Sequence, residues 1–190
     1  MIDKNISLNI LQDWSSNKQN IKGRIIMILY RLAALLRSYP LLTILFFWYL
    51  IIYKIFIGWI FNIEIGSRVK IGRGLKLEYG YGSVINGNAV LGNYCTIRQL
   101  TTIGTKWLDD GSIGPSPLIG DNVDIGVNAT IIGNIKIGSN VSIGAGAVVT
   151  KDIDPNCVVG GNPAIILKMV YQFSADEKNS LSGEQPYHLI

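Results

Sequence analysis

Apolar residues recur with a spacing of six along the second half of this chain. Isoleucine followed by glycine fills most of these positions, and the pairs begin at Ile65, Ile71, Ile103, Ile119, Ile125, Ile137 and Ile143. A second small or apolar residue stands two positions earlier in most units, as at Ile63, Val69 and Val123. A period of six matches neither the pattern of an amphipathic helix nor the alternation of a hairpin. It predicts a mainly β fold, a triangular parallel β-helix in which each unit supplies one short strand and one turn.

The six-residue frame has two interruptions. It slips between Leu77 and Leu91, and it stops over residues 105–117, which are polar and rich in turn-forming residues. We predict that 105–117 projects from the coil as a loop, and such loops are where solenoids place function. The pattern therefore separates residues 1–62, which we expect to form a helical, apolar and basic region, from a β-helix over 63–164. It predicts a short C-terminal helix and a tail within residues 165–190.

Residues 21–61 are apolar and basic. Pro40 interrupts the helical pattern there, and Arg24, Arg31 and Arg37 fall six or seven residues apart, roughly along one helix face. Three alternatives stay open for this region: helices in an oligomer interface, an interfacial helix pair on a membrane with arginines at headgroup level, or a transmembrane span. The uncharged run Leu41–Tyr53 is shorter than the roughly 20 residues that a span needs.

Charge is distributed unevenly along the chain. The first 76 residues hold 11 of the 17 Lys and Arg residues but only 3 of the 13 Asp and Glu residues. Basic residues separated by aliphatic runs suit an anionic membrane surface and not a nucleic-acid groove, so no nucleic-acid partner is expected. Cys95 and Cys157 lie far apart in no metal-binding spacing. We expect reduced, structural thiols in a cytoplasmic protein, with association at the inner face of the membrane as an additional expectation.

The repeat region resembles the hexapeptide-repeat acyltransferases, which have left-handed β-helices. Two segments carry the resemblance: Ile143–Ile153, which reads IGAGAVVTKDI, and Gly74–Asn86, which matches the first active-site segment of serine acetyltransferases. The phrase over residues 12–32 is more similar to the colanic-acid and capsular polysaccharide relatives. The resemblance implies a homotrimer that binds acetyl-CoA between neighbouring β-helices and transfers the acetyl group to a small-molecule or glycan acceptor.

The resemblance also implies which residues contact CoA. They are Gly126, Gly144, Ala145, Thr150, Lys151 and Lys168. The small residues would border the pantetheine arm, and the two lysines would meet the phosphates. Corner geometry alone is the alternative for the glycines, and a solvated side chain is the alternative for Lys151. No metal is expected, because a γ-class carbonic anhydrase site needs three histidines and the β-helix has none.

The expected catalytic histidines are replaced in this chain. Transfer to a hydroxyl group needs a general base at hydrogen-bond distance. The resemblance places one histidine in the first segment and one in the projecting loop, and these positions hold Tyr79 and Ser116. The only histidine of the chain is His188 in the C-terminal tail, near the terminal Ile190.

Weaker acid–base candidates remain near these two positions. Glu78 can act as a base only if burial raises its pKa toward neutrality. Tyr79 can protonate the departing CoA sulfur. Asp109 and Asp110 lie in the loop, where a role in the Asp-Asp-Gly turn is the main alternative.

Three functions follow from these observations. The first is an acetyl-CoA-dependent acetyltransferase that acts on a hydroxyl or amine of a sugar or polysaccharide precursor, or on serine in cysteine biosynthesis. The second is a catalytically impaired paralogue that binds CoA or a partner protein as a scaffold. The third is a purely structural solenoid. The loop and the CoA phrase favour the first.

Overall fold

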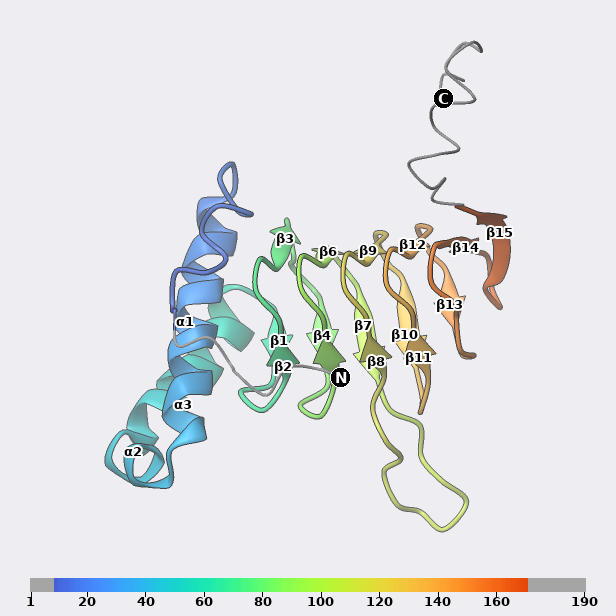
Figure 1. The fold of residues 1–190 in the computed structure, drawn as a ribbon. Helices are drawn as coiled ribbons and strands as arrows, with labels where there is room; N and C mark the ends of the chain where they lie inside the picture. Colours follow the sequence, from blue (N-terminus) through green and yellow to red (C-terminus); the bar gives the residue numbers. More distant parts are fainter. Residues whose placement is uncertain (1–8, 171–190) are drawn as a thin grey trace.

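The protein is a parallel β-helix with helices packed on its first coil (Figure 1). The structure, a computed structural model, describes residues 9–170. His188 and Ile190 therefore lie outside the described residues. The predicted mainly β solenoid is confirmed, with three sheets as its three faces.

Each face of the coil is one sheet of short strands. Sheet A contains β1 (Glu64–Ile65), β4 (Val84–Ile85), β7 (Thr102–Gly104), β10 (Thr130–Ile132) and β13 (Val148–Val149). Sheet B contains β2 (Lys70–Ile71), β5 (Val90–Leu91), β8 (Leu118–Ile119) and β11 (Lys136–Ile137). Sheet C contains β3 (Lys76–Glu78), β6 (Thr96–Arg98), β9 (Asp124–Ile125), β12 (Ser142–Ile143), β14 (Cys157–Gly160) and β15 (Ile165–Met169).

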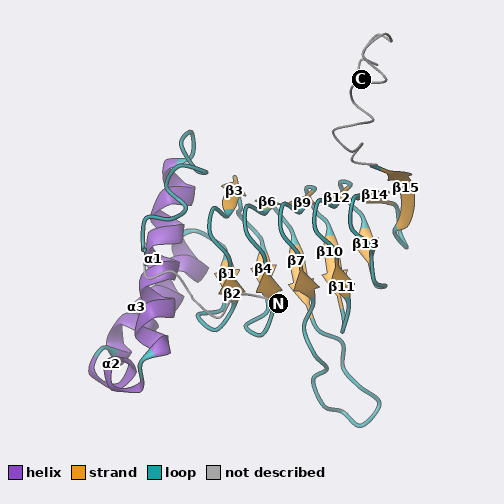
Figure 2. Ribbon diagram, viewed as in Figure 1, coloured by secondary structure: helices purple, strands orange, loops and turns teal. Residues whose placement is uncertain are grey.

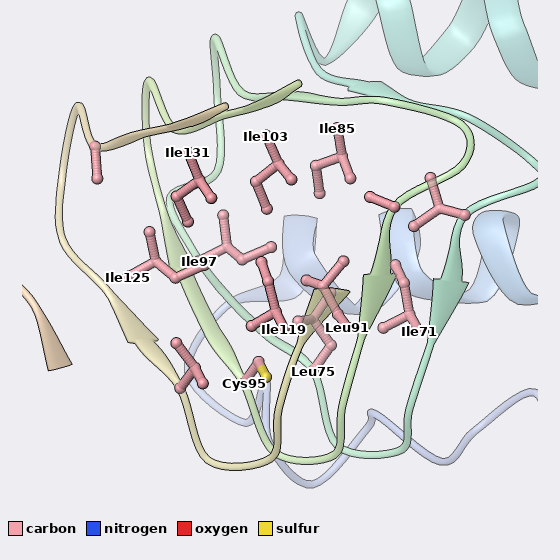
Figure 3. Packing of buried hydrophobic residues seen from close by; sticks show 14 of the residues in the cluster. Ile71, Leu75, Ile85, Leu91, Cys95, Ile97, Ile103, Ile119, Ile125 and Ile131 are labelled. Atoms are coloured by element: carbon pink, nitrogen blue, oxygen red, sulfur yellow. The ribbon is translucent and has the colours of Figure 1, made fainter. Parts of the chain in front are cut away.

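The core is a stack of aliphatic side chains inside the coil. Equivalent residues of successive coils pair in register, as Ile85 with Ile103 and Ile103 with Ile131. Figure 3 shows these side chains in a row inside the coil. The in-phase positions are nearly all fully buried, which explains why the six-residue period is so regular.

The frame slip near Tyr79 is a longer corner. Interior positions Leu77 and Ile85 are eight residues apart, whereas Ile97 and Ile103 are six apart. The extra residues form a turn in which Gly80 and Gly82 have positive φ angles of 59° and 67°. The strands on either side keep their pairing, so the insertion changes one corner and leaves the sheets intact.

Three helical segments and one π-helix lie against the first coil. They are α1 (Ile21–Ser38), α2 (Pro40–Leu45), α3 (Phe47–Ile55) and η1 (Phe56–Ile60). The side chain of Asn20 caps α1 by accepting from Gly23 N, and Pro40 forces the preceding residue into an extended conformation that ends α1. Within residues 9–170, none of the helices has the length and apolar character needed to cross a membrane.

Polar side chains of the N-terminal region cover the free strand edges of the first coil. Asn17 bonds both Leu75 O (2.7 Å) and Leu77 N (2.9 Å), as a neighbouring strand would. The hydroxyls of Tyr30 and Tyr53 donate to backbone carbonyls of the other two faces, at 2.6 and 2.9 Å. These bonds satisfy backbone groups that the end of a solenoid would otherwise leave unpaired.

The position of Arg31 differs from the expected one. Its guanidinium is buried and forms a two-pronged ion pair with Asp13, with Nε–Oδ2 at 2.8 Å and Nη2–Oδ1 at 3.1 Å. Arg31 also donates to the carbonyls of Ile71 and Gly72. Arg31 therefore faces the coil, so the alternative that places the arginines at headgroup level is wrong for this residue.

The predicted C-terminal helix is also wrong. Residues 165–169 form β15, which pairs antiparallel with β14. The segment is rich in β-branched and aliphatic residues, and β14 offers a free edge beside it. Lys168 consequently lies on an exposed strand of sheet C.

Candidate active site

Two edges of the coil hold the candidate residues. The C–A corner comprises the turns from sheet C to sheet A, at residues 79–83, 99–101, 126–129 and 144–147. The A–B corner comprises the turns from sheet A to sheet B, including residues 86–89, 105–117 and 150–152. Glu78, Tyr79, Gly126, Gly144 and Ala145 lie at or beside the C–A corner. Asp109, Ser116, Thr150 and Lys151 lie at the A–B corner.

Sheet A separates the two groups within one chain. Tyr79 precedes β4 and Ser116 follows β7, so the two positions flank this sheet from opposite sides. Lys151 follows β13 of sheet A, whereas Lys168 lies on β15 of sheet C. One chain therefore does not unite Tyr79 with Ser116, and it places Lys151 and Lys168 on different faces.

Tyr79 is presented to solvent by its backbone. Its φ angle is +65°, a left-handed conformation that L-residues rarely adopt, and its side chain is 72% exposed. The carbonyl of Tyr79 accepts from Tyr81 N at 2.8 Å, which holds the tight turn. Within residues 9–170, the Tyr79 hydroxyl makes no hydrogen bond, so its ring is available to a ligand at the C–A corner.

Glu78 is held as a carboxylate by two cations. Lys76 Nζ lies 2.6 Å from Oε1, and Arg98 Nε lies 2.9 Å from Oε2. The hydrogen bond from Lys76 is the main cause that lowers the pKa of Glu78, and the charge of Arg98 acts in the same direction. The condition set for Glu78 as a general base, that burial raises its pKa toward neutrality, is therefore not met in the described residues.

Arg98 extends this charged row along sheet C. Its Nη1 also donates to Asp124 on the next strand, and this contact is the main cause that raises the pKa of Arg98. The row runs across β3, β6 and β9 next to the C–A corner. It fixes a positive and a negative charge beside Tyr79 at neutral pH.

Ser116 is buried at the base of the loop and is hydrogen-bonded to the neighbouring turn. Ser116 is 6% exposed, and its Oγ donates a hydrogen bond to Asn86 Oδ1 at 2.8 Å. The same oxygen accepts from Asn88 N at 3.0 Å. Ser116 thus joins the end of the loop to the neighbouring turn of the A–B corner.

The loop itself extends away from the coil (Figure 1). An antiparallel bridge joins Trp107 to Ile113 across the loop. At its tip, Asp110 Oδ1 accepts from Ser112 N and Oγ, at 2.8 and 2.6 Å, and these bonds lower the pKa of Asp110. Asp109 is exposed beside it. Asp109 and Asp110 therefore lie in a turn, in agreement with the alternative that they serve the Asp-Asp-Gly turn.

The two glycines of the C–A corner differ in their surroundings. A Cβ on Gly126 would stand 2.6 Å from Ile143 O and 2.6 Å from Ala145 N, whereas one on Gly144 would stand 3.3 Å from Val159 O. Gly126 is thus required for the close stacking of successive corners, which is the corner-geometry alternative. Gly144 and Ala145 remain accessible beside it, and Ala145 is exposed.

Among residues 9–170, no cluster of three or more His, Cys, Asp or Glu side chains is placed to hold a metal ion. The chemistry of the described corners is instead that of small residues, backbone groups and single cations. Lys151 is exposed on the A–B corner, where it can meet an anionic group of a ligand.

Known proteins share both the repeat and the coil. A family profile described as "Bacterial transferase hexapeptide (six repeats)" matches residues 116–151. WcaB of Escherichia coli strain K12, whose name assigns it to colanic acid biosynthesis as an acetyltransferase, is 42% identical over 115 residues. The matched region is 60% of this chain and 69% of WcaB. The chain belongs to the hexapeptide-repeat transferase family.

Serine acetyltransferases of this family are similar as well. The enzyme of Synechococcus elongatus is 38% identical over 106 residues, which are 56% of this chain and 43% of that protein. The chain thus spans less than half of that relative's length. The solved serine acetyltransferase of Brucella abortus strain S19 in complex with coenzyme A has a TM-score of 0.72 and 27% identity, covering 85% of this chain and 67% of that one.

Two residues of this hexapeptide-repeat transferase were missed as site components. Arg98 forms an ion pair with Glu78, and Asn86 accepts a hydrogen bond from the Ser116 hydroxyl. A signal for them exists in the repeat, because the residue after each interior position is usually glycine. The polar departures from that rule are Glu78, Asn86, Arg98 and Thr150. At Glu78, Asn86 and Arg98 the polar side chain in place of the glycine forms a hydrogen bond or an ion pair with another side chain.

The thiols of this transferase are expected to be inert in the folded state. Cys95 and Cys157 are both free and fully buried, and burial raises the pKa of Cys95 from its usual 9.0 to about 11. A thiol-reactive dye at pH 8 should therefore count no thiols in the native protein and two in denaturant. Rapid labelling without denaturant would contradict the buried positions.

The raised pKa of Cys95 also has a consequence for stability. In the unfolded chain the thiol ionises near its usual pKa of 9.0, while the folded state keeps the proton to about 11. Stability from this group is therefore complete below pH 9 and is lost as the pH rises toward 11. Urea titrations of the wild type and Cys95→Ala between those pH values measure it.

Proposed function

We propose that this protein transfers an acetyl group from acetyl-CoA to a hydroxyl or amine of a sugar or polysaccharide precursor. The observation that carries the proposal is the similarity to WcaB, which extends over 69% of that protein at 42% identity. The Brucella relative bound to coenzyme A supports CoA as the carrier of the acyl group. In this proposal acetyl-CoA is the donor substrate.

The proposed assembly is a homotrimer. In a ring of three identical copies, each copy meets its neighbour through two different patches. A ring can therefore set the C–A corner of one copy against the A–B corner of the next. Such contact would join Tyr79 and Ala145 of one copy with Ser116 and Lys151 of its neighbour, which a single chain keeps apart.

The residues fit the parts of the donor in this arrangement. Gly144 and Ala145 would leave room for the pantetheine arm, because neither carries a side chain beyond Cβ. Lys151 would neutralise phosphate charge, and Thr150 offers a hydroxyl beside it. Lys168 lies on sheet C and would contact the donor only from a different side.

The acceptor chemistry follows from the replaced histidines. Glu78 is held ionised by Lys76 and Arg98, so it is a weak base at neutral pH. An amine that is partly unprotonated attacks a thioester without strong base assistance, whereas an alcohol needs proton removal during attack. We therefore favour an amine acceptor, with the Tyr79 hydroxyl able to protonate the departing sulfur.

Serine O-acetylation is the second candidate and has equal support from relatives. The Synechococcus and Brucella proteins are both named serine acetyltransferases. A catalytically impaired paralogue is the third, favoured by Tyr79 and Ser116 at the expected histidine positions. The three candidates differ in acceptor and in turnover, which makes them separable in one assay.

The assay follows release of free CoA thiol from acetyl-CoA with L-serine, amino sugars and neutral sugars as separate acceptors. Calorimetric titration with CoA measures binding independently of turnover. Release with an amino sugar supports the proposal, and release with serine alone supports the second candidate. Binding without release for any acceptor, followed by activity in Tyr79→His, supports the impaired paralogue.

Two variants sharpen the assay. Lys151→Ala should weaken CoA binding about tenfold, since a charge-assisted hydrogen bond contributes roughly 1.5–3 kcal/mol. Lys136→Ala changes an exposed lysine on sheet B and should leave binding unchanged. Absence of CoA binding in the wild type would refute both the proposed transferase and the paralogue.

A further inference from the structure

The outward side of α2, α3 and η1 is apolar. We call it the outer helical face, and its exposed members include Leu41, Ile44, Leu45, Trp48, Ile52 and Trp59. The opposite side of the same helices packs inward, where Tyr49 and Tyr53 donate to carbonyls of Leu29 and Ile65. Helices on a protein surface normally have polar residues on their outward side. These helices are apolar on the outward side as well as on the inward side, so both sides are suited to apolar surroundings.

The charges within the helical region itself have one sign. From Ile21 to Ile63 the chain has five cationic residues and no Asp or Glu. The charge of Arg31 is neutralised by its ion pair with Asp13, whereas Lys22 and Lys54 are exposed and Arg37 is half-buried. The free cations therefore lack acidic partners in the helical region itself.

An open groove adjoins the outer helical face. It has a volume of about 850 Å³ and lies between α3, η1 and the first coil. Arg37, Lys54 and Arg68 contribute cations to its lining, and Leu50, Ile51 and Trp59 contribute apolar surface. Glu64 is the one acidic residue among the lining residues of this groove. Cations beside an apolar wall match an amphiphile with an anionic head.

The geometry restricts how lipid can be met. α3 and η1 together run from Phe47 to Ile60, well short of the roughly 20 residues that span a bilayer. An apolar helical face of this length binds by lying in the interface plane, with tryptophans at headgroup level and cations on phosphates.

We propose that the outer helical face docks this protein on the surface of an anionic lipid bilayer. Arg37 and Lys54 contact lipid phosphates, while Leu45, Trp48 and Trp59 enter the headgroup–acyl boundary. A second copy of the chain fits the face less well. Pairing two copies of it about a twofold axis would bring the cations of both helical regions together, and these regions contain no Asp or Glu to offset them, whereas anionic lipid supplies counter-charge.

Vesicle co-sedimentation of the full chain tests this. Vesicles of phosphatidylcholine alone are compared with vesicles that also contain phosphatidylglycerol, whose anionic headgroups give the surface a negative potential. Binding is expected with the anionic vesicles and should weaken in high salt. Lys54→Gln should lower the partition coefficient about fivefold, since each surface cation contributes about 1 kcal/mol.

Matched variants separate this face from general hydrophobicity. Leu45→Ser and Leu167→Ser change leucines that are each 63% exposed, the first on α2 and the second on β15 at the far end of the coil (Figure 2). Leu45→Ser should reduce binding about tenfold and Leu167→Ser should not, because only the first side chain would enter lipid. Circular dichroism verifies that both variants are folded.

Three results would overturn the proposal. Equal binding to neutral and anionic vesicles would remove the role of Arg37 and Lys54. Equal loss in Leu45→Ser and Leu167→Ser would remove the role of the face. Absence of vesicle binding, together with a larger wild-type assembly that Leu45→Ser dissociates in light scattering, would assign the face to a second copy.

Discussion

Asp13→Ala is expected to lower the free energy of unfolding by about 3–5 kcal/mol, because it leaves a buried guanidinium without its counter-charge. The pair is almost fully enclosed, with side-chain exposures of 4% for Arg31 and 1% for Asp13. Asp13 also accepts from Leu75 N at 2.9 Å, so the variant loses a bond to the coil as well. The loss should fall on the contact between the N-terminal helices and the first coil.

A double variant distinguishes an unpaired charge from lost packing. Asp13→Ala/Arg31→Met removes both charges, so it should be more stable than Asp13→Ala alone, although two carbonyls then lose the Arg31 donor. Asp109→Ala alters an exposed aspartate of the loop and should change stability by less than about 0.5 kcal/mol. Urea unfolding followed by circular dichroism measures all three. A single variant no more costly than Asp109→Ala would contradict the buried pair.

Gly126→Ala is expected to destabilise the protein by about 3 kcal/mol, since overpacking of a tight site costs roughly 1–3 kcal/mol and here the obstacle is backbone. The new methyl group would stand 2.6 Å from both Ile143 O and Ala145 N. Neither atom can rotate away, so successive corners of the coil must separate. The effect is on folding and should appear without any CoA present.

Gly87→Ala is the matched control for this prediction. A methyl group there has only Arg68 Cβ near it, at 3.9 Å, and Gly87 has no positive φ angle. Its free energy of unfolding should be within about 0.5 kcal/mol of that of the wild type. If Gly126→Ala were equally stable but bound CoA weakly, Gly126 would be a ligand contact and the packing argument would fail.

The coil was predictable because its signal is local and repeated. Each unit places one residue inside at a fixed spacing, so Ile65 to Val149 could be assigned without knowledge of other contacts. The C-terminal strand was not predictable on this basis. Whether residues 165–169 form a helix or a strand depends on the free edge of β14, which exists only once the coil has formed.

The candidate site was predictable in position but not in chemistry. The two frame interruptions lie at Tyr79 and at the loop, the places where the structure departs from a plain coil. The state of Glu78 depends on Lys76 and Arg98, and Arg98 lies on a different strand that only the fold brings near. The ion pair of Arg31 was missed for the same reason, since Asp13 lies 18 residues earlier in the chain.

The two ends of the solenoid determine whether it can polymerise. A bare first coil and a bare last coil offer complementary strand edges, so identical molecules could add head to tail into a fibre. Here Asn17, Tyr30 and Tyr53 already occupy backbone groups at the first end. At the other end β15 reverses direction, and an antiparallel strand cannot template the next parallel coil. Head-to-tail stacking is therefore opposed by side chains at the first coil and by chain reversal on sheet C of the last coil.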